Sequence, residues 1–145
     1  MKPRINAITL GVNDLEKSLA FYRKLGLPSK GLIGTEFKGD KTHPSGTIAF
    51  FEMQGGLILA LYPRVELAKD AHLHVGPPSA TEFSIGYAVR TREEVDALLK
   101  RAKAAGAIIT EKPYDRPWGI YSGYFQDPDG HLWEVIWNPQ LEVKD

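Results

Sequence analysis

Hydrophobic and polar residues follow the same order twice along this chain. In the first half, alternation predicts a strand at Ile5–Val12, and apolar residues at helical spacing then predict a helix that ends at Gly26. Three further strands are predicted in this half, at Gly31–Gly34, Thr47–Met53 and Leu57–Tyr62. The first half therefore has the order strand, helix and three strands.

The second half repeats this order. A strand is predicted at Glu82–Arg90, followed by a helix that begins at Thr91 and ends at Gly106. The remaining predicted strands are Ala107–Thr110, Gly119–Gln126 and His131–Trp137.

The repeat predicts how the chain is organised. We expect one α+β domain over residues 1–145, made of two tandem βαβββ modules at residues 4–62 and 82–139, which a linker at residues 63–81 joins. Each helix is expected to begin with a capping box, which pairs a Ser, Thr, Asp or Asn residue with a Glu three positions later. The two predicted boxes are Asn13 with Glu16 and Thr91 with Glu94.

The first strand of each module has one face of large apolar residues and one of small residues. The large face comprises Ile8, Leu10 and Val12 in the first module and Phe83, Ile85, Tyr87 and Val89 in the second. The small face comprises Ala7, Thr9 and Gly11 in the first and Ser84, Gly86 and Ala88 in the second. A helix covers only one face of a sheet, so we expect it on the large face. The small faces would then line a trough with room for a ligand, unless they only accommodate bulky neighbours.

Composition narrows the classes of function. The chain has 18 Lys and Arg residues against 18 Asp and Glu residues, so there is no electrostatic reason to expect nucleic acid or an anionic membrane as a partner. It has no cysteine, and no stretch is apolar enough to span a bilayer. We expect a cytoplasmic protein.

One carboxylate breaks the hydrophobic pattern near the C-terminus. The sequence Asp127-Pro128-Asp129-Gly130 predicts a tight turn, and alternation after it places Glu134 on the same strand face as Leu132 and Ile136. Glu134 either reaches a wet rim, is bound by a neighbouring Arg, Lys or backbone donor, or lies in a pocket that needs an acid. In a pocket it could act as a general acid or base, or bind a ligand amine or hydroxyl.

Two segments resemble a known superfamily. Residues 8–22 (ITLGVNDLEKSLAFY) and 127–135 (DPDGHLWEV) are similar to the two signature segments of the vicinal oxygen chelate superfamily, which groups glyoxalase I, bleomycin resistance proteins and extradiol dioxygenases. The likeness extends to the tandem repeat and covers nearly the whole chain. It implies an open, trough-shaped (glyoxalase-like) sheet and a homodimer. The chemistry stays open, because the superfamily includes many reactions and also non-catalytic binders.

The resemblance also implies where a divalent metal would bind. The positions that carry its ligands in metal-dependent members correspond to Ala7, Ala60, Ser84 and Glu134, and only Glu134 keeps a ligand residue. One carboxylate and one hydroxyl do not make a site for a first-row metal, so we expect no metal cofactor.

Aromatic residues are candidates for a ligand-binding wall. Pro117-Trp118-Gly119 resembles the segment that borders the ligand trough in bleomycin-resistance-like members, so Trp118 is the first candidate for stacking and Tyr121 the second. Arg116 could pair with Glu134 or with an acidic ligand. The predicted ligand-binding set is completed by Phe50, Ala7, Ala60 and Ser84.

Three functions are open at this point. The leading hypothesis is metal-independent binding of a small aromatic organic molecule in the trough. The second is a lyase or isomerase of the glyoxalase type that uses Glu134 as acid or base, or a metal held by Glu134, His72 and His74, since the two histidines share a face if their segment is extended. The third is a non-catalytic interaction module.

Overall fold

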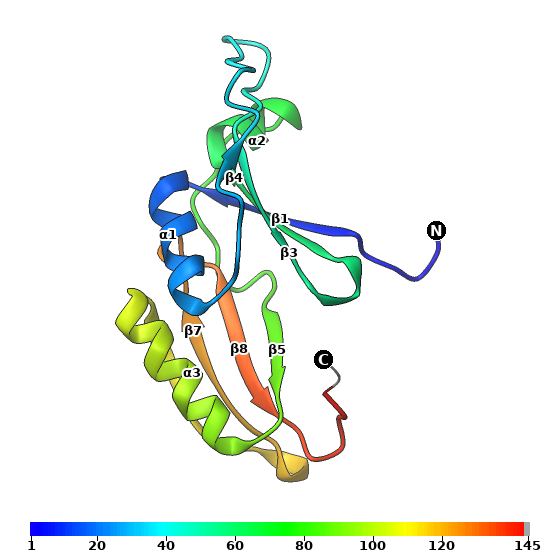
Figure 1. Ribbon diagram of the computed structural model, residues 1–145, viewed down its shortest axis with the longest axis vertical. Coiled ribbons are helices and arrows are strands. Elements are labelled where there is room, and N and C mark those ends of the chain that lie inside the picture. The colour runs from blue at the N-terminus through cyan, green and yellow to red at the C-terminus, as the bar shows by residue number, and fades with distance from the viewer. Residues whose placement is uncertain (144–145) are drawn as a thin grey trace. The chain divides into compact units, whose positions relative to one another are not determined.

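The chain folds into two compact units, each with its own four-stranded sheet. The structure is a computed structural model that describes residues 1–143. The first unit ends at Pro77 and the second begins at Pro78, within the predicted linker. Figure 1 shows a helix lying against the strands of each unit.

The first unit contains two helices and a mixed sheet. Its strands are β1 (Ala7–Val12), β2 (Leu32–Ile33), β3 (Ile48–Glu52) and β4 (Ile58–Pro63), and its helices are α1 (Leu15–Leu25) and α2 (Arg64–Asp70). The sheet order is β1-β4-β3-β2, with β1 parallel to β4 and the other neighbours antiparallel. A short 3₁₀ turn at Gln54–Gly56 joins β3 to β4.

The second unit repeats this topology. It contains β5 (Ile85–Val89), α3 (Arg92–Ala105), β6 (Ile108–Asp115), β7 (Tyr121–Gln126) and β8 (Leu132–Trp137). The sheet order is β5-β8-β7-β6, with β5 parallel to β8. The predicted α+β class and the two βαβββ modules are therefore confirmed, and neither four-stranded sheet closes into a barrel.

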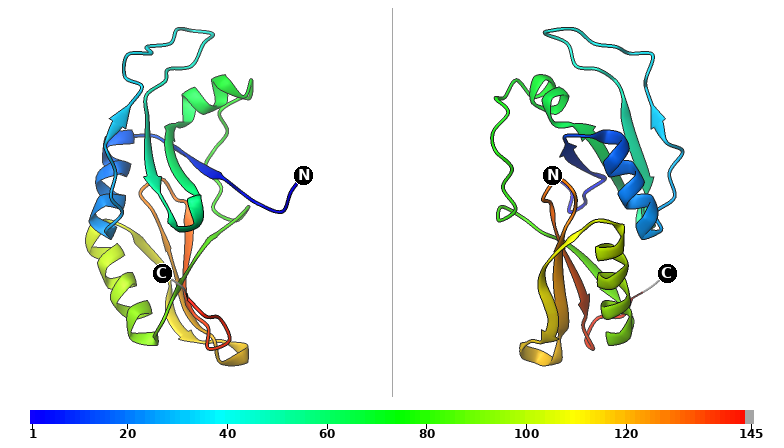
Figure 2. Two further views of the ribbon diagram at one scale, coloured as in Figure 1. Left: turned by 45° about the vertical axis from the view of Figure 1, so that its right-hand side comes forward. Right: turned by 90° about the vertical axis from the view of Figure 1, so that its left-hand side faces the viewer.

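In each unit a helix seals one face of the sheet. Tyr22 of α1 is fully buried and packs with Phe51 of β3, and Leu10 of β1 lies in the same core. In the second unit, Val95 and Leu99 of α3 are buried over a sheet whose core strands are β7 and β8. The views in Figure 2 show both helices on one side of their own sheets, so the opposite sheet faces are not covered by α1 or α3.

The predicted N-cap residue of α1 is wrong by one position. Asp14, not Asn13, is the N-cap residue, and its side chain accepts a hydrogen bond of 2.9 Å from the backbone N–H of Lys17. Thr91 caps α3 as predicted, but Glu94 accepts from the N–H of Arg90 rather than of Thr91. Gly26 and Gly106 end the two helices in the left-handed conformation, as predicted.

The large face predicted for the second module is only partly buried. Val89 is buried, but Tyr87 is 45% exposed, and Phe83 lies before the start of β5 and is 53% exposed. The reason is the placement of α3, which packs mainly over β6, β7 and β8 and least over β5. The first-module face, with Leu10 and Val12 buried, is as predicted.

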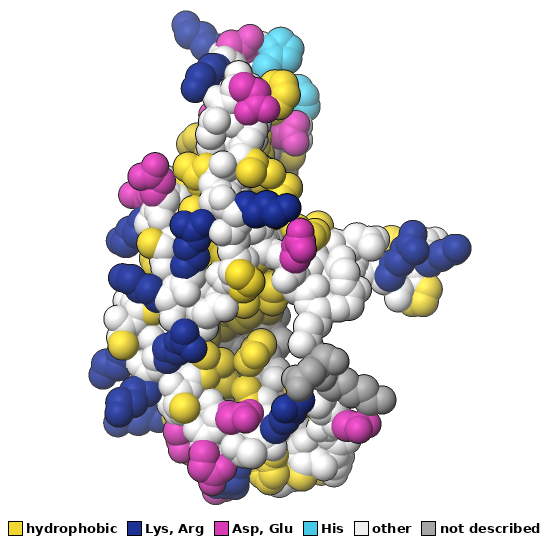
Figure 3. Space-filling view, in the orientation of Figure 1, with side chains coloured by type: hydrophobic (Ala, Val, Ile, Leu, Met, Phe, Trp, Pro, Cys, Tyr) yellow, Lys and Arg dark blue, Asp and Glu magenta, His cyan; other side chains and the backbone are white. Residues whose placement is uncertain are grey.

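No helix among residues 1–143 combines the length and the apolar character needed to cross a membrane. On the face of the molecule in Figure 3, basic and acidic side chains both occur, with hydrophobic side chains between them. This mixture agrees with the formal net charge of zero.

Replacing Gly123 of β7 with alanine should destabilise the protein. A Cβ there would lie 2.7 Å from Leu99 Cδ1 and 2.9 Å from the Glu111 carbonyl oxygen, so α3 or β6 must shift. We expect a loss of about 1–3 kcal/mol in the free energy of unfolding, measured by urea denaturation. Gly86→Ala is the matched control, because a Cβ at Gly86 meets nothing within 4 Å. Equal effects of the two substitutions would contradict the packing described here.

Candidate functional site

The candidate site lies on the face of the second sheet that α3 leaves uncovered. Glu134 of β8 stands directly between Gly86 of β5 and Tyr124 of β7 in the strand register. In the next pair along this face, Ser122 lies opposite Ile136. The acid singled out from the sequence is therefore a partly buried residue in the middle of a sheet.

A buried hydroxyl group orients the Glu134 carboxylate. The Ser122 hydroxyl donates a hydrogen bond of 2.8 Å to Glu134 Oε1, and Ser122 itself is fully buried. Tyr124 is the neighbour of Glu134 on β7. Burial, followed by the charge of the neighbouring Glu134 side chain, raises the pKa of Tyr124 above its ordinary value. Tyr124 thus stays neutral at neutral pH.

Arg116 lies close to Tyr114 and Tyr124. Its guanidinium donates to the Tyr114 hydroxyl at 2.9 Å and to the Ser122 carbonyl oxygen at 3.4 Å. It also lies 4.2 Å from the centre of the Tyr114 ring and 5.3 Å from that of Tyr124. Within residues 1–143 no ion pair joins Arg116 to Glu134, so the first of its two predicted roles is not seen.

The sheet neighbours of Glu134 are Gly86 and Tyr124, and the other residues predicted for the second module are not among them. Tyr121 donates a hydrogen bond of 2.9 Å to Asp96 of α3, and Arg92 lies 4.1 Å from its ring centre, so Tyr121 is on the helix side of the sheet. Trp118 is 80% exposed in the 3₁₀ turn Pro117–Gly119 and has a φ of 63°. Ser84 is exposed just before β5.

The three first-module positions share one sheet face. Thr9 of β1, Ala60 of β4 and Phe50 of β3 lie side by side in the register, and Ala7 is on the same face of β1 as Thr9. Phe50 also lines a pocket of about 430 Å³, together with Ile33 and residues 28–31.

The two histidines of the alternative metal set belong to the first unit, whereas Glu134 belongs to the second. His72 follows α2 with a φ of 54°, and its N–H donates to the Lys69 carbonyl oxygen. The segment is therefore not extended at His72, so the condition under which His72 and His74 would share a face is not met. A metal held by these residues and Glu134 stays a prediction.

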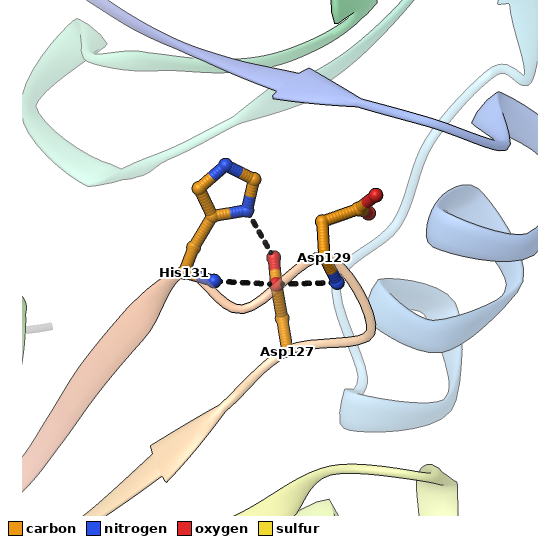
Figure 4. A group of neighbouring side chains, drawn as sticks. All are labelled: Asp127, Asp129 and His131. Carbon is orange, nitrogen blue, oxygen red and sulfur yellow. Dashed lines mark hydrogen bonds and ion pairs between the residues drawn. The ribbon is translucent and has the colours of Figure 1, made fainter. Parts of the chain in front are cut away.

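The residues at the family's metal positions do not fit a metal. Ala7 and Ala60 offer no donor atom, and the sheet neighbours of Glu134 are Gly86 and Tyr124. Among residues 1–143, one group of three has side chains close enough to share an ion, within 4.8 Å of one another. It consists of Asp127, Asp129 and His131 (Figure 4).

This group is explained by the turn between β7 and β8. Asp127 Oδ1 accepts hydrogen bonds of 2.9 Å from the N–H groups of Asp129 and His131, and Oδ2 accepts one of 2.8 Å from His131 Nδ1. In Figure 4 the Asp129 carboxylate extends away from the Asp127–His131 pair. The predicted turn is confirmed, and His131 flanks it as predicted.

The fold has the architecture of known proteins. Two tandem βαβββ modules are the fold of the vicinal oxygen chelate class. The family model of the Glyoxalase/Bleomycin resistance protein/Dioxygenase superfamily matches residues 4–135. The chain belongs to this superfamily.

Three similar proteins illustrate its range. A glyoxalase-related enzyme from Fulvimarina pelagi has a crystal structure with a TM-score of 0.79 and 30% identity, over 98% of this chain and 93% of that one. A probable lactoylglutathione lyase from Vibrio cholerae is 29% identical, over 97% of this chain and 94% of its own. The metallothiol transferase FosB from Shouchella clausii is 29% identical, over 90% of this chain and 77% of its own.

The contact between Tyr124 and Glu134 predicts a measurable titration shift. In Glu134→Gln, the pKa of Tyr124 should fall, because the charge of the carboxylate is lost, and it should stay above the ordinary value because burial remains. This pKa is measured by nuclear magnetic resonance of ring-labelled tyrosine. The signal of Tyr124 is identified as the one that is absent in Tyr124→Phe. Ser122→Ala, which keeps the carboxylate charge, should leave the pKa of Tyr124 raised. An unchanged value in Glu134→Gln would show that the two side chains do not interact.

Proposed function

We propose that this protein binds a small aromatic organic molecule on the uncovered face of its second sheet, without a metal ion. Glu134 would accept a hydrogen bond from a hydroxyl or amine of the ligand. The observation that carries the proposal is the arrangement of the carboxylate: Ser122 holds it with a hydrogen bond of 2.8 Å, beside Tyr124, on a face that α3 does not cover. A pre-oriented acceptor loses little entropy when a ligand binds.

The donor set supports the metal-free part of the proposal. A first-row metal needs three or four nitrogen, sulfur or oxygen ligands, and the corresponding positions 7 and 60 are alanine. In addition, Oε1 of Glu134 already accepts a hydrogen bond from Ser122. A carboxylate bound in this way is suited to a hydrogen-bonding ligand.

The surroundings of Glu134 support an aromatic ligand. Tyr124 lies directly beside the carboxylate, Tyr114 is nearly half exposed, and Ile136 adds apolar surface to the same sheet face. Aromatic side chains bind flat apolar molecules by offset or edge-to-face contacts. Trp118 is proposed as a further contact, because it is an exposed aromatic residue of the same unit.

A second candidate function is catalysis by a lyase or isomerase of the glyoxalase type. The name of the Vibrio cholerae relative, a probable lactoylglutathione lyase, supports it. So does the position of Glu134 beside Tyr124, since a carboxylate beside a phenol can accept a proton from a bound substrate. We also propose a cytoplasmic homodimer, on the sequence resemblance and the composition alone.

The proposal is tested by isothermal titration calorimetry with two neutral probes, 2-naphthol and its methyl ether. Because only the naphthol can donate to Glu134, Glu134→Gln should weaken its binding by about fivefold or more and leave the ether unaffected. Glu93→Gln, which removes an exposed carboxylate from α3, is the control. An equal loss of affinity for both probes would show that Glu134 does not accept a hydrogen bond from the ligand. Absence of binding across a panel of hydroxylated aromatics would favour an interaction module instead.

A further inference from the structure

We infer that Arg116 is an anion-binding residue and that the molecule bound on the second sheet carries a carboxylate as well as its aromatic ring. This inference rests on the proposed function, because it names the chemical class of the ligand. It concerns a part of the sheet face that the Glu134 hydrogen bond does not use.

The positive charge of Arg116 is partly buried without a carboxylate partner in the described residues. A guanidinium has five N–H donors, and Arg116 makes two hydrogen bonds, both to neutral oxygen atoms of Tyr114 and Ser122. Its Nε is buried and has no hydrogen-bond partner in the described structure. A buried charge normally has a counter-charge, because desolvation is costly. The missing counter-charge is what a carboxylate ligand would supply.

A second arginine of the same unit shows the usual solution. Arg92 also lies against an aromatic ring, that of Tyr121, but both of its terminal nitrogens donate to the Asp115 carboxylate. Arg92 is therefore a charge that the protein itself neutralises. Arg116 also lies against an aromatic ring, that of Tyr114, but it donates to no carboxylate of the described residues.

The two tyrosines hold the guanidinium of Arg116 in a fixed position. The rings of Tyr114 and Tyr124 lie 4.2 and 5.3 Å from it, and the Tyr114 hydroxyl accepts one of its hydrogen bonds. A planar guanidinium that is oriented in advance binds a carboxylate with two parallel hydrogen bonds more readily than a mobile one does.

Two opposite charges thus lie near the same aromatic residue: Arg116 is 5.3 Å from the Tyr124 ring centre, and Glu134 is the sheet neighbour of Tyr124. Glu134 raises the pKa of Tyr124 and Arg116 lowers it, so both charges act on this phenol from nearby. They do not neutralise each other, because no ion pair joins them in residues 1–143. An aromatic acid with a hydroxyl or amino group matches this pattern, with its carboxylate on Arg116 and its donor on Glu134.

The test compares 6-hydroxy-2-naphthoate with 6-hydroxy-2-naphthamide, which have nearly the same shape and differ in charge. Wild-type protein should bind the acid about tenfold more tightly than the amide, since a hydrogen bond to a charged group is stronger than one to a neutral group. In Arg116→Met the preference should disappear while the affinity for the amide is kept. Arg92→Met is the matched control and should keep the preference, because its charge is already neutralised by Asp115.

The outcomes separate this inference from the proposed function. If acid and amide bind equally to the wild type, or if Arg116→Met keeps the preference, the inference is wrong while aromatic binding stands. If neither probe binds, both proposals fail. If Arg116→Met does not fold, the Nε–H resonance of Arg116 is followed by nuclear magnetic resonance in the wild-type protein instead. This resonance is identified as the one that is absent from the spectrum of Arg116→Lys. That resonance should move on addition of the acid and not of the amide, and no movement at saturation would overturn the inference.

Discussion

The hydrogen bond from Ser122 to Glu134 is the interaction on which the rest of this account depends. It joins β7 to β8 on the face away from α3, and it turns an acid within a sheet into an oriented acceptor. Without it, the carboxylate would be a partly buried charge with a desolvation cost and no compensation. With it, the second unit has an oriented acidic group on one sheet face, while the other face forms the core with α3.

Most of the fold could be predicted from the sequence, because each module has strong local signals. The alternation of β1, the glycine that ends α1 and the turn at residues 127–130 are short-range features, and all three are seen. The cap of α1 was misplaced by one residue because Asn13 and Asp14 are both good caps. The exposure of Tyr87 depends on where α3 packs on the sheet, and the placement of a helix is a long-range property that alternation does not contain.

The candidate site could be predicted only in part. Glu134 stood out as an acid among apolar residues, but its partners Ser122 and Tyr124 were missed. Their signal was present: the turn pairs Asp127 with His131, and counting back along both strands from that pair places Tyr124 opposite Glu134. The position of Tyr121 on the helix side follows from the same alternation. The stacking of Arg116 on Tyr114 could not be deduced, because it depends on side-chain rotamers and on the bulges of β6.

The central claim is that this superfamily member presents Glu134 as a hydrogen-bonding acid and not as a metal ligand. The most direct measurement is the metal content of the purified protein after incubation with Zn²⁺, Ni²⁺, Mn²⁺ and Fe²⁺ in turn and removal of free ions, in wild type and in Glu134→Gln. The account predicts a content well below one ion per chain for every metal, and no difference between the two proteins. A content close to one ion per chain in the wild type that is lost in Glu134→Gln would contradict it.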